Sequence, residues 1–231
     1  MKRIKDKIGL ITGGASGIGR LMMLDLAKRG AKIVVWDIDP SALKNLANEV
    51  EQKLFYIMMF ICDVTDREAV YRLAESIRTE IGTADVVSGK TLLETPDEKI
   101  INSINANTLS LFWTLKAFLP SILEQNEGYI VTIASAAGII GNEFGLYEAI
   151  RMELRQRKSA VKTTIVCPFF IDAGMFSGVK TKFSFLLPTL KSEYTAKAIV
   201  KAVLRNQHRP SCRVSSTVSS SCVSSLRISW T

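Results

Sequence analysis

Short apolar runs alternate with amphipathic segments along the first part of the chain. The runs at 7–12, 32–36 and 54–61 are almost wholly apolar, and each precedes a segment whose apolar residues recur every three or four positions. Short apolar runs are typical of strands buried on both faces, and the longer period is typical of helices. The pattern predicts a β-α-β-α-β-α order, hence an α/β fold with a doubly wound parallel sheet covered by helices on both faces.

Local start and stop signals refine these elements. The first helix is expected from Ser16 to Arg29, with Gly30 ending it, and Asp39 and Asp66 are expected to begin the next two. The remaining expected helices span 41–53, about 97–124, 146–157 and 193–205, and the remaining expected strands span 129–134 and 161–167.

Two segments break the alternation. Where a fourth strand is due, residues 84–87 read ADVV and run directly into Ser88-Gly89, so we expect a shortened fourth strand. Residues 211–231 contain nine serines and no acidic residue, which cannot form a periodic buried face. We therefore predict a single domain over 1–207 and a Ser-rich disordered tail over 208–231.

Composition is that of one soluble globular domain: 231 residues, 47% hydrophobic and 23% charged. No run approaches eighteen apolar residues, so nothing in the sequence is expected to target or span a membrane, and the expected location is cytoplasmic. The net charge of +8 is concentrated at the ends, with +3 in residues 1–7 and +4 from Arg205 onward. A basic face on the folded domain is therefore not expected, and neither is nucleic-acid binding.

Metal and His-based chemistry have little support. The chain contains a single histidine, His208, and its cysteines form no Cys-x-x-Cys pair. The four cysteines are Cys62, Cys167, Cys212 and Cys222. We predict no metal site, no Ser-His-Asp triad, and thiols that stay reduced.

A glycine-rich loop, TGGASGIGR at 12–20, stands between the first strand and the first helix. Gly13 suits a tight turn, Gly17 lets the backbone approach a pyrophosphate, and Gly19 allows close packing of the helix. The loop predicts a dinucleotide site, in which Ser16 and Ile18 also contribute at the helix start. A P-loop is excluded because Arg20 and Leu21 replace the required lysine and hydroxyl residue.

The end of the second strand carries an acidic residue, Asp37. A carboxylate there can accept hydrogen bonds from the adenosine ribose and would repel a 2′-phosphate, so NAD is favoured over NADP. The alternative is a solvated loop acid. Asp63 and Val64 follow the third strand and are expected either beside the adenine or simply in a turn.

Together these motifs resemble the short-chain dehydrogenase/reductase family. The other segments that carry the resemblance are CDVTD (62–66), INANT (104–108), IVTIASAAG (130–138) and VCPFFIDAGMF (166–176). Further stretches such as LFWTLKAFLPSIL are similar to its retinol and hydroxysteroid dehydrogenase branch. The resemblance implies a Rossmann-like fold and hydride transfer between nicotinamide and a small lipophilic alcohol or ketone. It also implies that Asn107 is the active-site asparagine, that Ser135 orients the substrate and that Ile171 lies against the nicotinamide carboxamide.

By the same resemblance, the endoplasmic reticulum or lipid-droplet surface is the alternative location, although the family's anchoring N-terminal segment is not seen. The sequence leaves the oligomeric state open, and a homo-oligomer is one of the states it allows.

Three departures from the family concern catalysis. Asp85 runs into Val86 where an Asn-Asn-Ala-Gly turn is expected, and Ala173 replaces a threonine found in many relatives. The Tyr-x-x-x-Lys pair is also absent: Tyr147 stands near the expected spacing from Ser135, but Arg151 follows it one turn later. Arginine differs from lysine in geometry and reach, so Tyr147 is expected to pack rather than to act as an acid or base.

Three hypotheses remain open at the level of sequence. The chain is an NAD-dependent alcohol oxidoreductase using Ser135 and Tyr147, a cofactor-binding module that has lost catalysis, or an unstable product of altered splicing or gene decay. The residues favour the second and third, and the family resemblance favours the first.

Overall fold

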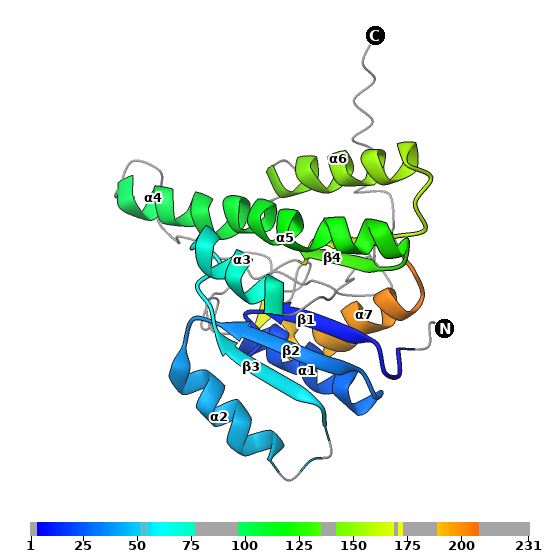
Figure 1. The fold of residues 1–231 in the computed structure, drawn as a ribbon. Coiled ribbons are helices and arrows are strands. Elements are labelled where there is room, and N and C mark those ends of the chain that lie inside the picture. The colour runs from blue at the N-terminus through cyan, green and yellow to red at the C-terminus, as the bar shows by residue number, and fades with distance from the viewer. Residues whose placement is uncertain are drawn as a thin grey trace.

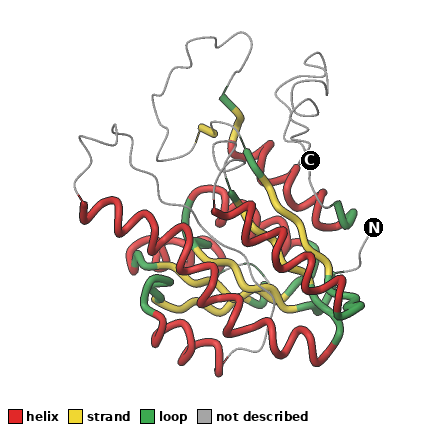
Figure 2. The backbone as a smooth tube through the Cα atoms, turned by 90° about the horizontal axis from the view of Figure 1, so that it is seen from above, coloured by secondary structure: helices red, strands yellow, loops and turns green. Residues whose placement is uncertain are grey.

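The computed structural model describes residues 4–51, 53, 55–76, 97–134, 142–168, 171–172 and 189–207. Within them, helices cover both faces of parallel strands, and the described body forms an α/β sandwich (Figure 1). Figure 2, turned by 90°, shows the strands in yellow with helices in red on either side. Parallel pairing between short, buried strands is the arrangement that their apolar sequences predict.

The first half of the molecule is a three-stranded parallel sheet in the order β1-β2-β3. Its strands are β1 (Ile8–Thr12), β2 (Lys32–Asp37) and β3 (Ile57–Ile61). The helices that follow them are α1 (Gly17–Lys28), α2 (Pro40–Val50) and α3 (Arg67–Ser76). Helices α1 and α2 pack on one face, against Ile33 and Val35, whereas α3 packs on the other, against Val34 and Trp36.

The second half is built around a parallel pair of strands, β4 (Tyr129–Ile133) and β5 (Lys162–Val166). The surrounding helical elements are α4 (Asp97–Ile104), the π-helix η2 (Asn105–Leu109), α5 (Ser110–Gln125), α6 (Asn142–Gln156) and α7 (Ser192–Leu204). A short parallel pair, β6 (Ile171–Asp172) and β7 (Leu190–Lys191), precedes α7.

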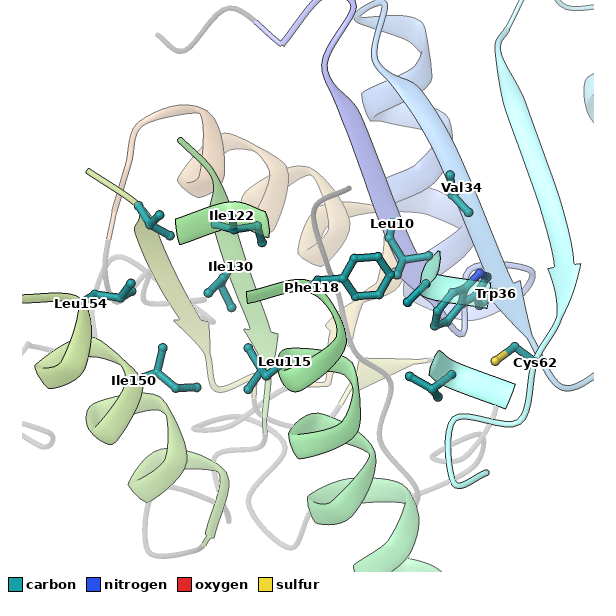
Figure 3. Close-up of a cluster of buried hydrophobic side chains, with 13 residues drawn as sticks. Leu10, Val34, Trp36, Cys62, Leu115, Phe118, Ile122, Ile130, Ile150 and Leu154 are labelled. Carbon is teal, nitrogen blue, oxygen red and sulfur yellow. The ribbon is translucent and has the colours of Figure 1, made fainter. Parts of the chain in front are cut away.

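Helices join the two halves from both faces. On one face, Phe118 of α5 lies 5.8 Å from Trp36 of β2 between ring centroids, and Ile130 of β4 belongs to the same buried cluster (Figure 3). On the other face, α1 packs directly on α7 through Met22 and Ile199. The hydrophobic core is therefore continuous between the halves, even though the described strands form separate hydrogen-bonded sets.

An apolar cavity of about 90 Å³ lies between the halves. Among the described strands, β1 pairs with β2 and β4 pairs with β5, but β1 and β4 do not pair with each other. The cavity is lined by Leu10 of β1, Met22 of α1, Val131 of β4 and Val200 of α7, among others. At the edge where these strands begin, Lys7 forms an ion pair of 2.5 Å with Glu127.

Most sequence predictions of elements are confirmed in the described residues. Asp39 accepts hydrogen bonds from the backbone N–H groups of Ser41 and Ala42, and Asp66 does the same for Glu68 and Ala69, so both acids cap helices as expected.

Three boundaries are wrong. The expected continuous helix at 97–124 is interrupted by the π-turn of η2, the helix expected from 146 begins at Asn142, and the strand expected from 54 begins at Ile57. Periodicity indicates which face of a helix is apolar, but not where its hydrogen-bonding pattern changes. The shortened strand at 84–87 and the tail at 208–231 lie outside the described residues.

Candidate functional site

The glycine loop lies at the carboxyl end of β1, between this strand and α1. Gly13 and Gly17 have φ values of +62° and +50°, in the region that favours glycine. A Cβ atom at Gly19 would lie 2.2 Å from the carbonyl oxygen of Gly13, so only glycine allows the helix to approach the loop this closely. The tight turn and the close packing that the sequence predicts are both present.

The start of α1 is open to a ligand. Ser16 occupies the N-cap position, but its side chain makes no capping hydrogen bond, and the first turn of α1 contains no acidic residue. A Cβ atom at Gly17 would meet no atom within 4 Å. Free N–H groups and the positive end of the helix dipole favour a phosphate at this position, so the loop fits the pyrophosphate of a dinucleotide.

Asp37 is the last residue of β2 and is only 8% exposed. Its Oδ2 accepts a hydrogen bond of 3.0 Å from the N–H of Ala15, within the glycine loop. Its Oδ1 accepts another, of 3.1 Å, from the N–H of Asp39. Each oxygen of a carboxylate can accept more than one hydrogen bond, so ribose hydroxyls can still bind. Asp37 therefore also holds the loop in place, which the sequence did not reveal.

Two apolar side chains stand exposed beside Asp37. Ile38 and Ile61 are each 63% exposed, and Ile61 is the register partner of Asp37 in the sheet. Large exposed apolar residues next to a polar binding group are typical of ligand surfaces. Neither isoleucine was predicted from the sequence, although an isoleucine directly after the strand-ending acid was a signal.

Arg20 follows the last glycine of the loop and forms an ion pair with Glu49 of α2. Its Nε donates to Oε2 of Glu49 at 2.8 Å, and Lys53 lies 3.5 Å from the other carboxylate oxygen. Burial opposes ionisation, but hydrogen bonding to Arg20 and the charges of Arg20 and Lys53 hold the pKa of Glu49 below its ordinary value. The ion pair was not predicted, because nothing in the sequence connects Arg20 with Glu49, 29 positions later.

Asp63 and Val64 follow β3. Asp63 accepts hydrogen bonds from the backbone N–H and the hydroxyl of Thr65, at 2.8 and 2.7 Å. Val64 is half-buried and packs against the cluster that contains Trp36 and Phe118. Both residues therefore have local structural roles, which agree with the turn alternative and leave the adenine alternative as a prediction.

Asn107 lies in the π-helix η2 and is half-buried. The turn closes when the N–H of Ser110 bonds to the carbonyl of Asn105, five residues earlier, while the Ser110 hydroxyl donates to the carbonyl of Ala106. Such single π-turns inside long helices often occur at functional sites. The structure therefore places Asn107 at an irregular turn of the helix, and its role as the active-site asparagine stays a prediction.

Tyr147 is buried in the core, at 2% exposure, against Ala134 and Ile165. Its hydroxyl accepts a long hydrogen bond, of 3.4 Å, from the hydroxyl of Thr163. Thr163 lies three residues before Val166 at the end of β5, which is about 10 Å along a strand. The hydroxyl of Tyr147 is therefore directed into the layer between α6 and the sheet, away from the carboxyl edge where ligands bind in such folds.

Arg151 lies one turn after Tyr147 on α6. Its Nη1 donates to Oε2 of Glu148 at 3.2 Å, and its buried Nε has no hydrogen-bond partner within the described structure. The guanidinium is therefore engaged with its own helix rather than with the hydroxyl of Tyr147.

The other predicted site residues are Ile171, which the structure describes, and residues that lie outside the described ranges. Ile171 is buried in β6 and pairs with Leu190 of β7. Ser135 and Ala173, and the segment where the Asn-Asn-Ala-Gly turn was expected, lie outside the described residues. In the described part of the chain, no three metal-ligating residues come together. Nor does any described helix have the length and apolar character to cross a membrane.

Comparison with known proteins identifies the family. The family model for short chain dehydrogenases matches residues 7–183, which include the glycine loop, Asp37, Asn107 and Tyr147. The chain belongs to the short chain dehydrogenase family. Members of this family bind NAD(H), and the geometry of the glycine loop described above fits that cofactor.

Relatives within the family place the chain in its retinol dehydrogenase-like branch. Short-chain dehydrogenase/reductase family 16C member 6 of Bos taurus is 40% identical over 227 residues, covering 89% of this chain and 72% of that protein. Epidermal retinol dehydrogenase 2 of Mus musculus is 38% identical over 229 residues, covering 89% of this chain and 74% of that protein. The fold is also that of a short chain dehydrogenase/reductase from Burkholderia phymatum solved in complex with NAD, with a TM-score of 0.81 at 21% identity, covering 91% of this chain and 90% of that one.

The match also indicates internal deletions. The alignment with the bovine relative is 227 positions long, but it contains only 89% of this 231-residue chain, which is fewer than 227 residues. The relative therefore has residues within the matched span that this short chain dehydrogenase lacks.

Proposed function

We propose that this chain binds NAD(H) through its glycine loop and Asp37, and that it has lost the proton-transfer half of the dehydrogenase reaction. The position of the Tyr147 hydroxyl carries the proposal. Bound NAD accepts or supplies a hydride, but the alcohol must also lose its proton to a side chain at the carboxyl edge. Tyr147 is buried with its hydroxyl against Thr163, and Arg151 is paired with Glu148.

The cofactor half of the site has the features that binding requires. The loop has its glycine geometry, the start of α1 is uncapped, and Asp37 lies within hydrogen-bonding distance of the loop. A preformed site needs little reorganisation to bind a ligand. A catalytically silent NAD-binding protein is therefore the proposed state, and an active dehydrogenase of lipophilic alcohols or ketones is the alternative.

The first experiment measures cofactor binding by the full chain. NAD should bind more tightly than NADP and should raise the melting temperature. Asp37→Ala should weaken NAD binding about tenfold or more and narrow its advantage over NADP, because a charged acceptor is lost.

Asp39→Ala is the matched control for that experiment. Asp39 is a neighbouring acid that caps α2, so its loss should lower stability by about 1 kcal/mol but preserve the cofactor preference. Equal affinities for the two cofactors in the unmodified chain would contradict the role of Asp37. Absence of any NAD-induced shift in melting temperature would contradict the whole proposal and favour an unstable product.

The second experiment tests Tyr147 directly. With NAD and either retinol or a hydroxysteroid, the unmodified chain should show no turnover above background, and Tyr147→Phe should leave both turnover and NAD affinity unchanged. General acid-base catalysis typically contributes about a hundredfold to ten-thousandfold, so a working tyrosine would be detected if any turnover occurred. Turnover that disappears in Tyr147→Phe would establish the active alternative.

A further inference from the structure

We propose that Glu49 is a specificity-determining residue that keeps Arg20 away from the position of an NADP 2′-phosphate. This inference rests on the proposed binding of NAD at the glycine loop. It concerns a residue of α2 that lies outside the loop and outside the strand-ending position of Asp37.

Arg20 is attached to the phosphate-binding loop itself. It follows Gly19, which packs directly on Gly13, and its N–H donates to the carbonyl of Ser16 at 3.0 Å. Its α-carbon is therefore within one helical turn of the open N-terminus of α1. Asp37, beside which a 2′-phosphate would lie, contacts Ala15 of the same loop, so a cation attached to this loop would attract the 2′-phosphate if its side chain were free to turn toward it.

The side chain of Arg20 instead extends toward α2. Helix α2 starts at Pro40, next to the Asp37 end of β2, and Glu49 lies nine residues further along it. At 1.5 Å per residue, that distance is about 13 Å along the helix axis. Nε and Nη2 of Arg20 both contact Oε2 of Glu49, at 2.8 and 2.5 Å, so the guanidinium is drawn away from the carboxyl edge.

Two carboxylates would then oppose NADP by different means. Asp37 repels a 2′-phosphate directly, whereas Glu49 neutralises and holds the cation that could bind it. Arginine is well suited to phosphate, since its planar group makes paired charge-assisted hydrogen bonds. Replacing Glu49 with glutamine removes the charge but retains the size of the side chain, which should release Arg20 toward the ribose.

The test compares dissociation constants of NAD and NADP for the full chain and its variants. Glu49→Gln should lower the ratio of the NADP constant to the NAD constant about tenfold, because one charge-assisted contact is gained. In Arg20→Gln/Glu49→Gln the ratio should return to its original value. Glu153→Gln is the matched control, since Glu153 of α6 forms an exposed ion pair with Arg157, just after this helix, and should leave the ratio unchanged.

A second variant keeps the inference testable if Glu49→Gln folds poorly. Arg20→Gln alone should leave the ratio unchanged, because Arg20 is held by Glu49 in the unmodified chain. The inference is overturned if Arg20→Gln weakens NADP binding selectively, if Glu49→Gln folds but keeps the original ratio, or if the double variant retains the full gain. If the unmodified chain binds NAD but Glu49→Gln leaves the ratio of the NADP and NAD dissociation constants unaltered, this inference alone is overturned. If the unmodified chain does not bind NAD, the proposed function is overturned as well.

Discussion

At the scale of single residues, the same side-chain types serve different purposes according to their surroundings. Asp37 ends β2, and Asp39, Asp63 and Asp66 lie shortly after strands. All four accept hydrogen bonds from backbone N–H groups beside them, but Asp37 also reaches across to Ala15 of the glycine loop. The long-range contact singles out Asp37 as the acid that organises the cofactor site. The position of Asp37 at the end of its strand predicted a contact with the ribose, but not the contact with Ala15.

Cys62, directly after β3, provides a prediction about pH at this scale. Burial, reinforced by the charges of Asp63 and Asp66, raises the pKa of its thiol from 9.0 to about 11. Between these values the unfolded chain releases a proton that the folded chain retains, so stability should fall as pH rises through this window. Urea midpoints measured across it should decrease less in Cys62→Ala than in the unmodified chain. An equal decrease in both would show that Cys62 does not contribute.

At the scale of elements, two hydrogen bonds of the buried Thr164 hydroxyl link β4, β5 and the segment just after α7. Thr164 of β5 is fully buried, and its hydroxyl donates to the carbonyl of Gln207 just after α7, at 2.6 Å. Because that donation uses its only proton, the 2.6 Å contact with Tyr129 must be a donation from the tyrosine. Burial of Tyr129 raises the pKa of its phenol, although hydrogen bonding to Thr164 opposes the rise.

We predict that Thr164→Val lowers the free energy of unfolding by about 1–3 kcal/mol, since it removes the hydrogen bonds with the buried Tyr129 hydroxyl and with the carbonyl of Gln207. Tyr129→Phe should also destabilise the protein, and the double variant should cost less than the sum of the single variants because they share one contact. Urea denaturation of the three variants measures this coupling. Strict additivity would mean that the two hydroxyls do not interact.

At the scale of the whole molecule, α5 is the main connection between the two sets of strands on its face of the sheet. Phe118 contacts Trp36 on one side and shares a cluster with Ile130 and Ile150 on the other (Figure 3). It is 1% exposed, whereas Phe112 of the same helix is 41% exposed. The pair therefore offers a test of how much this contact stabilises the folded chain.

Phe118→Ala should lower the free energy of unfolding by about 3–5 kcal/mol, because it removes a buried ring and leaves a cavity between the halves. Phe112→Ala should change it by no more than about 0.5 kcal/mol. Urea denaturation monitored by far-ultraviolet circular dichroism measures both. Similar losses in the two variants would show that α5 does not join the halves through Phe118.

The sequence by itself was sufficient for the parts of this protein that depend on local chemistry. Strands 8–12 and 32–37, the capping by Asp39 and Asp66, and the glycine turn of the cofactor loop all follow from period, φ preference and short-range hydrogen bonding. These interactions involve neighbours in the chain, so a single sequence contains the information they need.

Only the tertiary structure decided which distant groups meet. The contact of Asp37 with Ala15, the pair between Arg20 and Glu49, and the direction of the Tyr147 hydroxyl toward Thr163 each join separate elements. The packing of α6 on β5 determines how far along the sheet the Tyr147 side chain lies. The number of residues between Ser135 and Tyr147 does not determine it. The physical reason is that a helical period specifies the buried face of an element, whereas its height and its partners depend on all the side chains that fill the space between layers.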